Sequence, residues 1–376
     1  MNRLLGLELL RGVAALLVLV EHLPVAIGMV CGPGAAVPPA IEDFPGYWGV
    51  DLFFVLSGYL IGLTLSKPGT TARSFLLARL ARILPLYYVA SAVCLLVPTF
   101  RSKALSWPVA VTTGTLLPVA GDALDPMTAH PYGWTLCFEM AFYLAAAALA
   151  AAVGGRRAVP ALVAVFALGP LALAAAGPMA GWAFPNFALS PLAIEFALGL
   201  LAFRLTDRLP VWAAWAVLGV GAAACVRGVL AGGDYGLPSE LLADPRRALA
   251  RVTTWGVPAA ACVLGTARLD RAGTFRRLAR AATPLGAMSY SLYLVQPFAF
   301  VLTAALARAV GINAAWPAAA LAVAVTLALG AFAARYLDRP LHEAARGWAK
   351  WLSTPAQPRS ASSALTLASI KSRTLR

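Results

Sequence analysis

Charged residues are scarce in this chain of 376 residues. They make up 12% of the sequence and hydrophobic residues 60%, whereas about a quarter of an ordinary globular domain is charged. Segments such as 136–153 and 314–334 hold few charges or none, and each is long enough to cross a hydrocarbon core of about 30 Å as a helix. They lack the strict alternation of lipid-facing strands. The composition therefore excludes a soluble fold and predicts an all-α integral membrane protein.

Acidic residues and cysteines are also few. The 16 Asp and Glu face 30 Lys and Arg, which gives a net charge of +14. The cations lie at the ends of apolar segments, so we attribute the charge to membrane topology and expect no nucleic-acid partner. The five cysteines have no CxxC or other metal-type spacing, so we expect neither a disulfide framework nor a metal site. They are Cys31, Cys94, Cys137, Cys225 and Cys262.

Apolar stretches predict a single bundle of about ten membrane-spanning helices. The predicted spans are 5–28, 47–66, 82–99, 133–153, 158–177, 187–205, 210–230, 252–267, 285–307 and 314–335. A further stretch at 106–120 is short and contains Pro108 and Pro118, so we expect a re-entrant or interfacial segment. One membrane domain thus covers 1–350. The basic, Ser- and Thr-rich tail at 351–376 is predicted to be a disordered cytoplasmic extension.

The distribution of cations predicts the orientation of these spans. With both termini in the cytoplasm, most of the 30 Lys and Arg residues fall on the cytoplasmic side, as the positive-inside rule requires. A full crossing by 106–120 would move Arg156, Arg157 and the basic cluster at 268–280 to the outside. The rule therefore favours a segment at 106–120 that enters the membrane without crossing it.

Ionisable side chains within the spans are candidates for function, because burying them in a membrane costs free energy. Arg11 and His22 share one face of the first predicted helix and lie about 16 Å apart along its axis. Arg79 and Arg82 enter the third span at the level of Arg11, and Glu139 is predicted at a depth close to that of His22. This pattern indicates a cationic inner mouth and an outer acid–base cluster.

An acyl-coenzyme A thioester suits such a layout, because its phosphates bind arginine and its acyl end hangs on a thin pantetheine arm. Each residue also has a structural interpretation. Arg79 and Arg82 suit positive-inside anchors, and His22 and Glu139 suit buried packing partners. Asp51, near the outer start of the second span, is also predicted at a depth comparable to that of His22, but it suits a helix cap. Ser57 suits helix packing. We assign no role to Glu8 or Glu195.

Five sequence motifs in order along the chain resemble the acyltransferase-3 family of bacterial membrane acyltransferases, especially its exopolysaccharide-production branch. They are LELLRGVAALLVLVEH at 7–22, GVDLFFVLSGYLIG at 49–62, RLARILPLYYVA at 79–90, WTLCFEMAFYL at 134–144 and LGAMSYSLYLVQPF at 285–298. The closing segment LDRPL at 337–341 is similar to the acidic, basic and proline motif of the family, with Asp338 in place of Glu. Gln296 stands where many members have a histidine.

The resemblance implies an enzyme with catalytic His22, with Arg11 and Arg82 as essential cations and with Glu139 as an essential acid. We expect Glu139 to act with His22 in catalysis by orienting its imidazole, as the acid of a triad does. We expect Arg11, Arg79 and Arg82 to bind the phosphates of the coenzyme A donor. It implies transfer of an acyl group, usually acetyl from cytoplasmic acetyl-CoA, to a hydroxyl of a polysaccharide or other glycan. Lipid and the glycan acceptor would be the partners, and the protein would lie in the bacterial inner membrane. The rival interpretation is a polytopic transporter or flippase, in which the same charges line a substrate path. No sequence feature indicates an oligomeric state.

Overall fold

The computed structural model describes residues 4–97, 106–119, 128–177, 179, 182–231 and 238–353, and these residues form helices and connections without a β-strand. Nine helical stretches in this part of the chain are long and apolar enough to cross a membrane. They comprise α1 with α2 (Leu5–Glu21, Leu23–Cys31), α4 (Trp48–Leu65), α5 (Ala72–Leu96), α8 (Gly133–Val153), α9 (Gly155–Ala176), α12 (Val211–Leu230), α14 to α15 (Pro245–Arg251, Val257–Arg271), α16 (Arg276–Val310) and α17 to α18 (Ala315–Ala333, Arg339–Ser353). The prediction of an all-α membrane protein is confirmed.

The span expected at 187–205 is interrupted. It consists of α10 (Ala183–Ala188), the 3-10 turn η1 (Pro191–Ala193) and α11 (Ile194–Leu205). Pro191 cannot donate a backbone hydrogen bond, so it begins the turn and separates the helices. The resulting α11 is 12 residues long, which is too short to cross the hydrocarbon core alone. This interruption explains why the described residues contain nine stretches that are long and apolar enough to cross a membrane in place of about ten spans.

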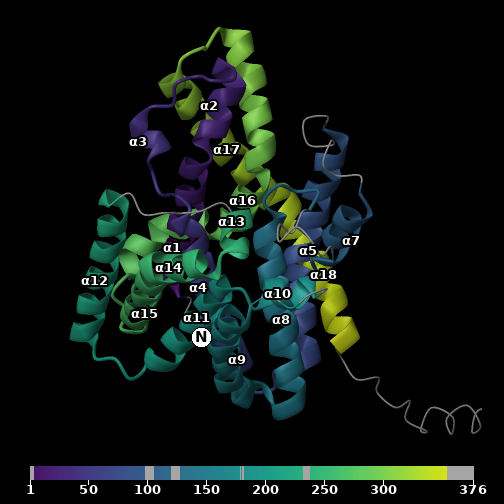
Figure 1. Cartoon of the computed structure of the whole chain (residues 1–376), viewed down its shortest axis with the longest axis vertical. Helices are drawn as coiled ribbons and strands as arrows, with labels where there is room; N and C mark the ends of the chain where they lie inside the picture. Colours follow the sequence, from purple (N-terminus) through teal and green to yellow (C-terminus); the bar gives the residue numbers. More distant parts are fainter. Residues whose placement is uncertain are drawn as a thin grey trace, which may run out of the picture.

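Close helix packing surrounds α4 and α11. The two helices pack against each other, and α11 also contacts α9 and α15. A Cβ atom on Gly58 would collide with the carbonyl oxygen of Phe196, and one on Gly199 with that of Val55. Small residues at this crossing therefore let the backbones approach closely, as in other membrane helix pairs. On the other side of the bundle α1 packs against α16 and α4 (Figure 1).

A short helix, α7 (Trp107–Thr115), occupies the segment expected to be re-entrant or interfacial. It has 9 residues, too few to cross the membrane, and it lies beside α5, where Tyr88 donates a hydrogen bond to the Gly114 carbonyl at 2.7 Å. At the other end of the chain α18 extends through Ser353. The rest of the tail predicted at 351–376 lies outside the described residues.

Two short π-helical segments interrupt long helices. The first, η2 (Val252–Gly256), joins α14 to α15, and the second, η3 (Ala334–Asp338), joins α17 to α18. Such segments often occur at functional sites, because the extra residue per turn changes the direction of nearby side chains. Here each one places a charged residue, Arg251 directly before η2 and Asp338 within η3, against a partner on a distant helix.

Candidate active site

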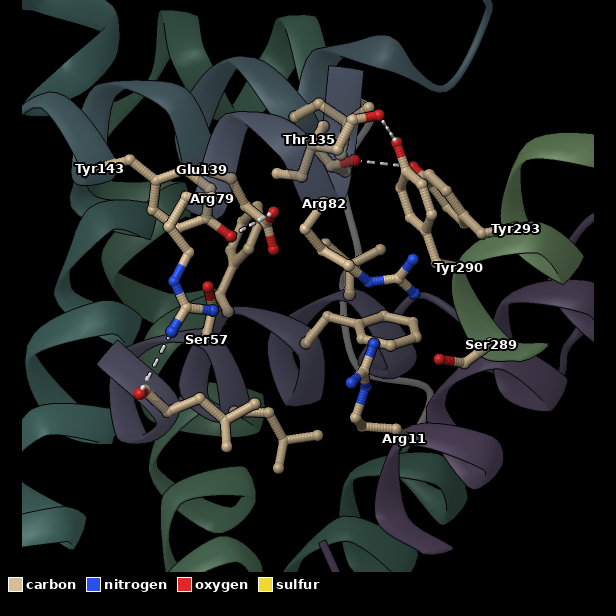
Figure 2. A pocket seen from close by; sticks show the side chains of 17 residues that line it. Arg11, Ser57, Arg79, Arg82, Thr135, Glu139, Tyr143, Ser289, Tyr290 and Tyr293 are labelled. Carbon is tan, nitrogen blue, oxygen red and sulfur yellow. Dashed lines mark hydrogen bonds between the residues drawn. The ribbon is translucent and has the colours of Figure 1, made fainter. Parts of the chain in front are cut away.

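A cavity of about 280 Å³ lies among α1, α4, α5, α8 and α16. Its residues on α4 run from Val50 to Leu60, so it extends about 15 Å along that helix. The polar side chains that line it are Arg11, Ser57, Arg79, Arg82, Thr135, Glu139, Tyr143, Ser289, Tyr290 and Tyr293 (Figure 2). We call the part around the three arginines the arginine end, and the part around Thr135 and Tyr293 the tyrosine end.

All three predicted cations line the arginine end. Figure 2 shows the guanidinium groups of Arg11 and Arg82 near each other and that of Arg79 beside Ser57. Arg79 donates to the Thr64 hydroxyl at 2.6 Å, and Arg82 donates from Nη1 to both oxygens of Asp338 at 2.8 and 2.9 Å. No described residue accepts a hydrogen bond from Arg11. The Ser289 hydroxyl, buried in the cavity wall, also has no partner in the described part of the chain. The cavity therefore offers donors that the protein itself leaves unused.

Glu139 lies at the arginine end. It accepts a hydrogen bond from Tyr143 at 3.0 Å and is in electrostatic range of Arg11 and Arg79. The expected depth close to His22 is therefore wrong. Glu139 belongs to the second turn of α8, and α8 lies so that this turn is level with Arg11, about 16 Å from His22 along the first helix. The single carboxylate partly balances the arginines beside it.

His22 sits at the junction of α1 and α2, outside the cavity lining. Its backbone N–H bonds to the Leu19 carbonyl at 3.2 Å, in a tighter turn than an α-helix. The carbonyl of Val18 is thereby released from its usual helical partner, and Nδ1 of His22 lies 2.7 Å from it. A carbonyl can only accept, so Nδ1 carries the proton and Nε2 of the neutral ring has a free lone pair. This bond performs the orienting role expected of Glu139.

An aromatic contact connects His22 to the cavity. The ring of Tyr132 packs on the imidazole with centroids 4.4 Å apart and on the ring of Tyr293 at 5.5 Å. Tyr293 lines the tyrosine end and donates to the Tyr132 carbonyl at 2.9 Å. Thr135, which also lines this end, lies 2.9 Å from the Tyr293 hydroxyl. Tyr132 therefore bridges the cavity wall and the predicted catalytic histidine.

A second histidine, His130, holds Tyr132 in place. It is fully buried, and its Nε2 donates to the Leu294 carbonyl at 2.9 Å while Nδ1 accepts from the Tyr132 N–H at 3.2 Å. Burial lowers the pKa of His130 to about 4, so the ring is neutral and can accept as well as donate. Neither His130 nor Tyr132 is among the predicted site residues, because neither lies within a predicted span.

Asp51 forms an ion pair with Arg251. It lies in the first turn of α4 without capping it and accepts from Arg251 Nε at 3.1 Å and Nη2 at 2.8 Å. Arg251 also donates to the Tyr47 carbonyl at 3.2 Å. Glu195 lies next to this pair, fully buried, and its two carboxyl oxygens have no hydrogen-bond partner in the described part of the chain. Arg251, which directly precedes the predicted span 252–267, is thus a buried cation with a structural role.

Apolar helices long enough to cross a membrane thus enclose a polar cavity that is lined by three arginines and one glutamate among the described residues. The family model described as the acyltransferase domain matches residues 4–335. The chain belongs to this family, acyltransferase 3, and is a multi-pass membrane acyltransferase.

The chain is similar to the exopolysaccharide production protein ExoZ of Rhizobium meliloti (strain 1021). The two chains are 30% identical over 311 residues, which cover 79% of this chain and 89% of ExoZ. No solved structure matches the chain.

Proposed function

We propose that this protein transfers an acyl group, acetyl from cytoplasmic acetyl-CoA, to a hydroxyl of a polysaccharide or related glycan at the bacterial inner membrane. The observation that carries the proposal is the cavity itself. It has three arginines at one end, and its other end is linked by Tyr132 to a histidine with a free Nε2. Both chain termini would lie in the cytoplasm, with the arginine end toward it.

The donor would bind with its phosphates at the arginine end. Arginine binds phosphate oxygens through paired N–H donors, and Arg11 donates no hydrogen bond to another described residue. The unpartnered Ser289 hydroxyl adds a further donor. Glu139 would hold Arg11 and Arg79 in place by charge attraction and limit the excess of positive charge when the site is empty. The thioester would then point along the cavity toward Thr135 and Tyr293.

His22 would act as the general base. Its Nε2 takes the proton from the acceptor hydroxyl as the hydroxyl oxygen attacks the thioester carbonyl carbon. The C–S bond then breaks, and the imidazolium returns the proton to the departing sulfur of coenzyme A. The Val18 carbonyl stabilises the imidazolium through the Nδ1–H bond, as the acid of a triad does. The products are the acylated glycan and coenzyme A with a free thiol.

The acceptor class rests on the printed name of ExoZ and on the family resemblance. The outer side of His22 is bordered by Tyr47, whose ring centroid lies 6.4 Å from the imidazole. An aromatic surface beside the base suits a sugar ring, because apolar sugar faces pack on aromatic faces. The rival function, transport of a glycan without chemistry, shares the membrane fold, but it does not require a histidine with a defined tautomer next to the cavity.

One experiment separates the two functions. Purified protein in nanodiscs is given acetyl-CoA and the host glycan, and free thiol and glycan acylation are measured by colorimetry and mass spectrometry. We expect equal amounts of thiol and acylated glycan, with neither product formed by a His22→Ala variant that still binds acetyl-CoA. Glycan movement across liposomes without thioester consumption would support the transporter and refute the proposal.

A further inference from the structure

Arg82 is held by residues from two other helices. Besides its bond to Asp338, its guanidinium lies 5.1 Å from the ring centroid of Tyr290. Tyr290 in turn donates to the Ile83 carbonyl at 2.7 Å, which fixes the ring beside the next residue of α5. Ser291 donates to the Asp338 carboxylate at 3.1 Å. The hydrogen bond from Ser291 therefore fixes the carboxylate that binds Arg82.

The position of Asp338 follows from the contact between α5 and α18. Pro85 has no N–H, so the carbonyl of Ala81, four residues earlier, lacks its usual helical partner. His342 supplies the missing donor, with Nδ1 at 3.1 Å from that carbonyl. Asp338 precedes His342 by one helical turn and so meets Arg82, the residue after Ala81. The motif LDRPL, which the proposed mechanism leaves without a role, thus lies against α5 one turn before Pro85 through Asp338, next to the His342 contact.

The pairing leaves part of the guanidinium available. All hydrogen bonds from Arg82 to described residues leave from Nη1, so the donors on Nε and Nη2 are not engaged by them. The side chain of Arg82 is 29% exposed and that of Asp338 only 8%. Arg82 lines the cavity and Asp338 does not. The carboxylate therefore engages one nitrogen of a guanidinium that lines the cavity, and Nε and Nη2 are left for a ligand there.

We propose that Asp338 is a positioning residue for donor binding, which orients Arg82 so that its free N–H donors meet a phosphate of the acyl-coenzyme A. The inference rests on the proposed function, because it assumes an acyl-CoA donor. An arginine held in one geometry loses little conformational freedom when the phosphate binds. The role belongs to binding and not to the chemical step.

The test compares acetyl-CoA with acetyl-pantetheine, which has the same thioester and no phosphate. We expect Asp338→Asn to raise KM for acetyl-CoA about tenfold or more, the loss of one charge-assisted contact, with kcat nearly unchanged. KM for acetyl-pantetheine should not change. The double variant Asp338→Asn with Arg82→Ala should bind acetyl-CoA like Arg82→Ala alone, because Asp338 acts through Arg82. Asp338→Glu should recover part of the affinity.

Two further variants keep the test decisive. Asp207→Asn removes another Asp–Arg pair, with Arg271, away from the cavity, and should leave both KM values unchanged. Ser291→Ala removes one support of Asp338 and should raise KM for acetyl-CoA by a smaller factor, which provides a test if Asp338→Asn does not fold.

Three results would overturn the inference while the proposed function stands. They are an unchanged KM in Asp338→Asn, tighter binding of acetyl-CoA, which would make Asp338 a competitor of the donor, and equal losses with both thioesters, which would indicate a structural role. If the wild-type protein does not bind acetyl-CoA at all, the proposed function fails and this inference with it.

Discussion

Two Arg–Asp ion pairs lie near α4 and differ in exposure. One is sealed in the protein interior, which we call the sealed side, and the other lies at the cavity, which we call the cavity side. On the sealed side Arg251 and Asp51 are 3% and 1% exposed, and the arginine uses Nε and Nη2 in a two-pronged contact with both carboxylate oxygens. On the cavity side Arg82 is 29% exposed and contacts Asp338 through Nη1 alone. Each pair lies beside a π-helical segment. In the sealed pair the arginine stabilises the fold. In the cavity pair some N–H donors of the arginine remain available to a ligand.

This difference predicts two kinds of variant. Changes on the cavity side should alter rate or donor affinity in a protein of normal stability. Changes on the sealed side should lower the free energy of unfolding, and the molecules that still fold should keep wild-type kinetics.

The largest kinetic effect is expected for His22→Gln. Glutamine retains polarity and approximate size but cannot accept a proton at neutral pH, and loss of a positioned base lowers the rate by about 10²- to 10⁴-fold. Steady-state acyl transfer by monodisperse protein measures the effect, with acetyl-CoA binding as the control. Near-normal turnover would place the chemistry elsewhere.

The largest effect on stability is expected for Asp51→Ala. It leaves Arg251 buried without its main counter-ion, and breaking a buried pair in this way costs about 3 to 5 kcal/mol. Thermal unfolding in a fixed detergent measures the loss, and Asp207→Asn at an exposed pair should cost about 1 kcal/mol or less. Equal unfolding temperatures for the two variants would refute the distinction between the sealed and exposed pairs.

A smaller effect is expected for Arg82→Ala, which removes the charge-assisted contacts to the donor. The loss of binding free energy should be about 1.5 to 3 kcal/mol, measured as the dissociation constant of acetyl-CoA by calorimetry. Arg82→Lys should restore only part of it, because an ammonium group lacks the planar fork of donors. Unchanged affinity in folded Arg82→Ala would argue against a phosphate site.

The smallest effect is expected for Glu195→Gln. Glu195 and Asp51 share one buried cation, Arg251, and a second buried carboxylate without compensation would cost several kcal/mol. We therefore expect the Glu195 carboxyl to hold its proton, so the neutral amide should change the unfolding free energy by less than about 1 kcal/mol. A loss as large as that of Asp51→Ala would show that Glu195 is ionised.

Much of the fold follows from local sequence. Runs of apolar residues located most of the spans, because a helix must exceed a known length to cross the membrane. The exception at 187–205 depends on Pro191, whose effect is local and therefore visible in the sequence, although hydropathy alone passes over it. The predicted cations also came together in one cavity, since positions three apart, such as Arg79 and Arg82, share a helix face.

The errors concern distances between helices. The level of Glu139 depends on how α8 lies against α1, and a count of residues from the start of a span does not contain that information. The partner of Asp51 is 200 residues away in the chain, in a segment that was assigned to a loop. Tertiary packing decides such pairings, and a single sequence carries no record of them.

The hydrogen bond from His22 to the Val18 carbonyl joins the residue that caps the end of α1 to a carbonyl in the last turn of that helix. Its acceptor is part of the main chain, so no side-chain substitution at residue 18 can delete it. The base therefore carries its own orienting group wherever the first helix moves. Side chains on neighbouring helices can therefore change to fit a different acceptor hydroxyl without changing which ring nitrogen bears the proton. The same helix can then supply the same base to many acceptors.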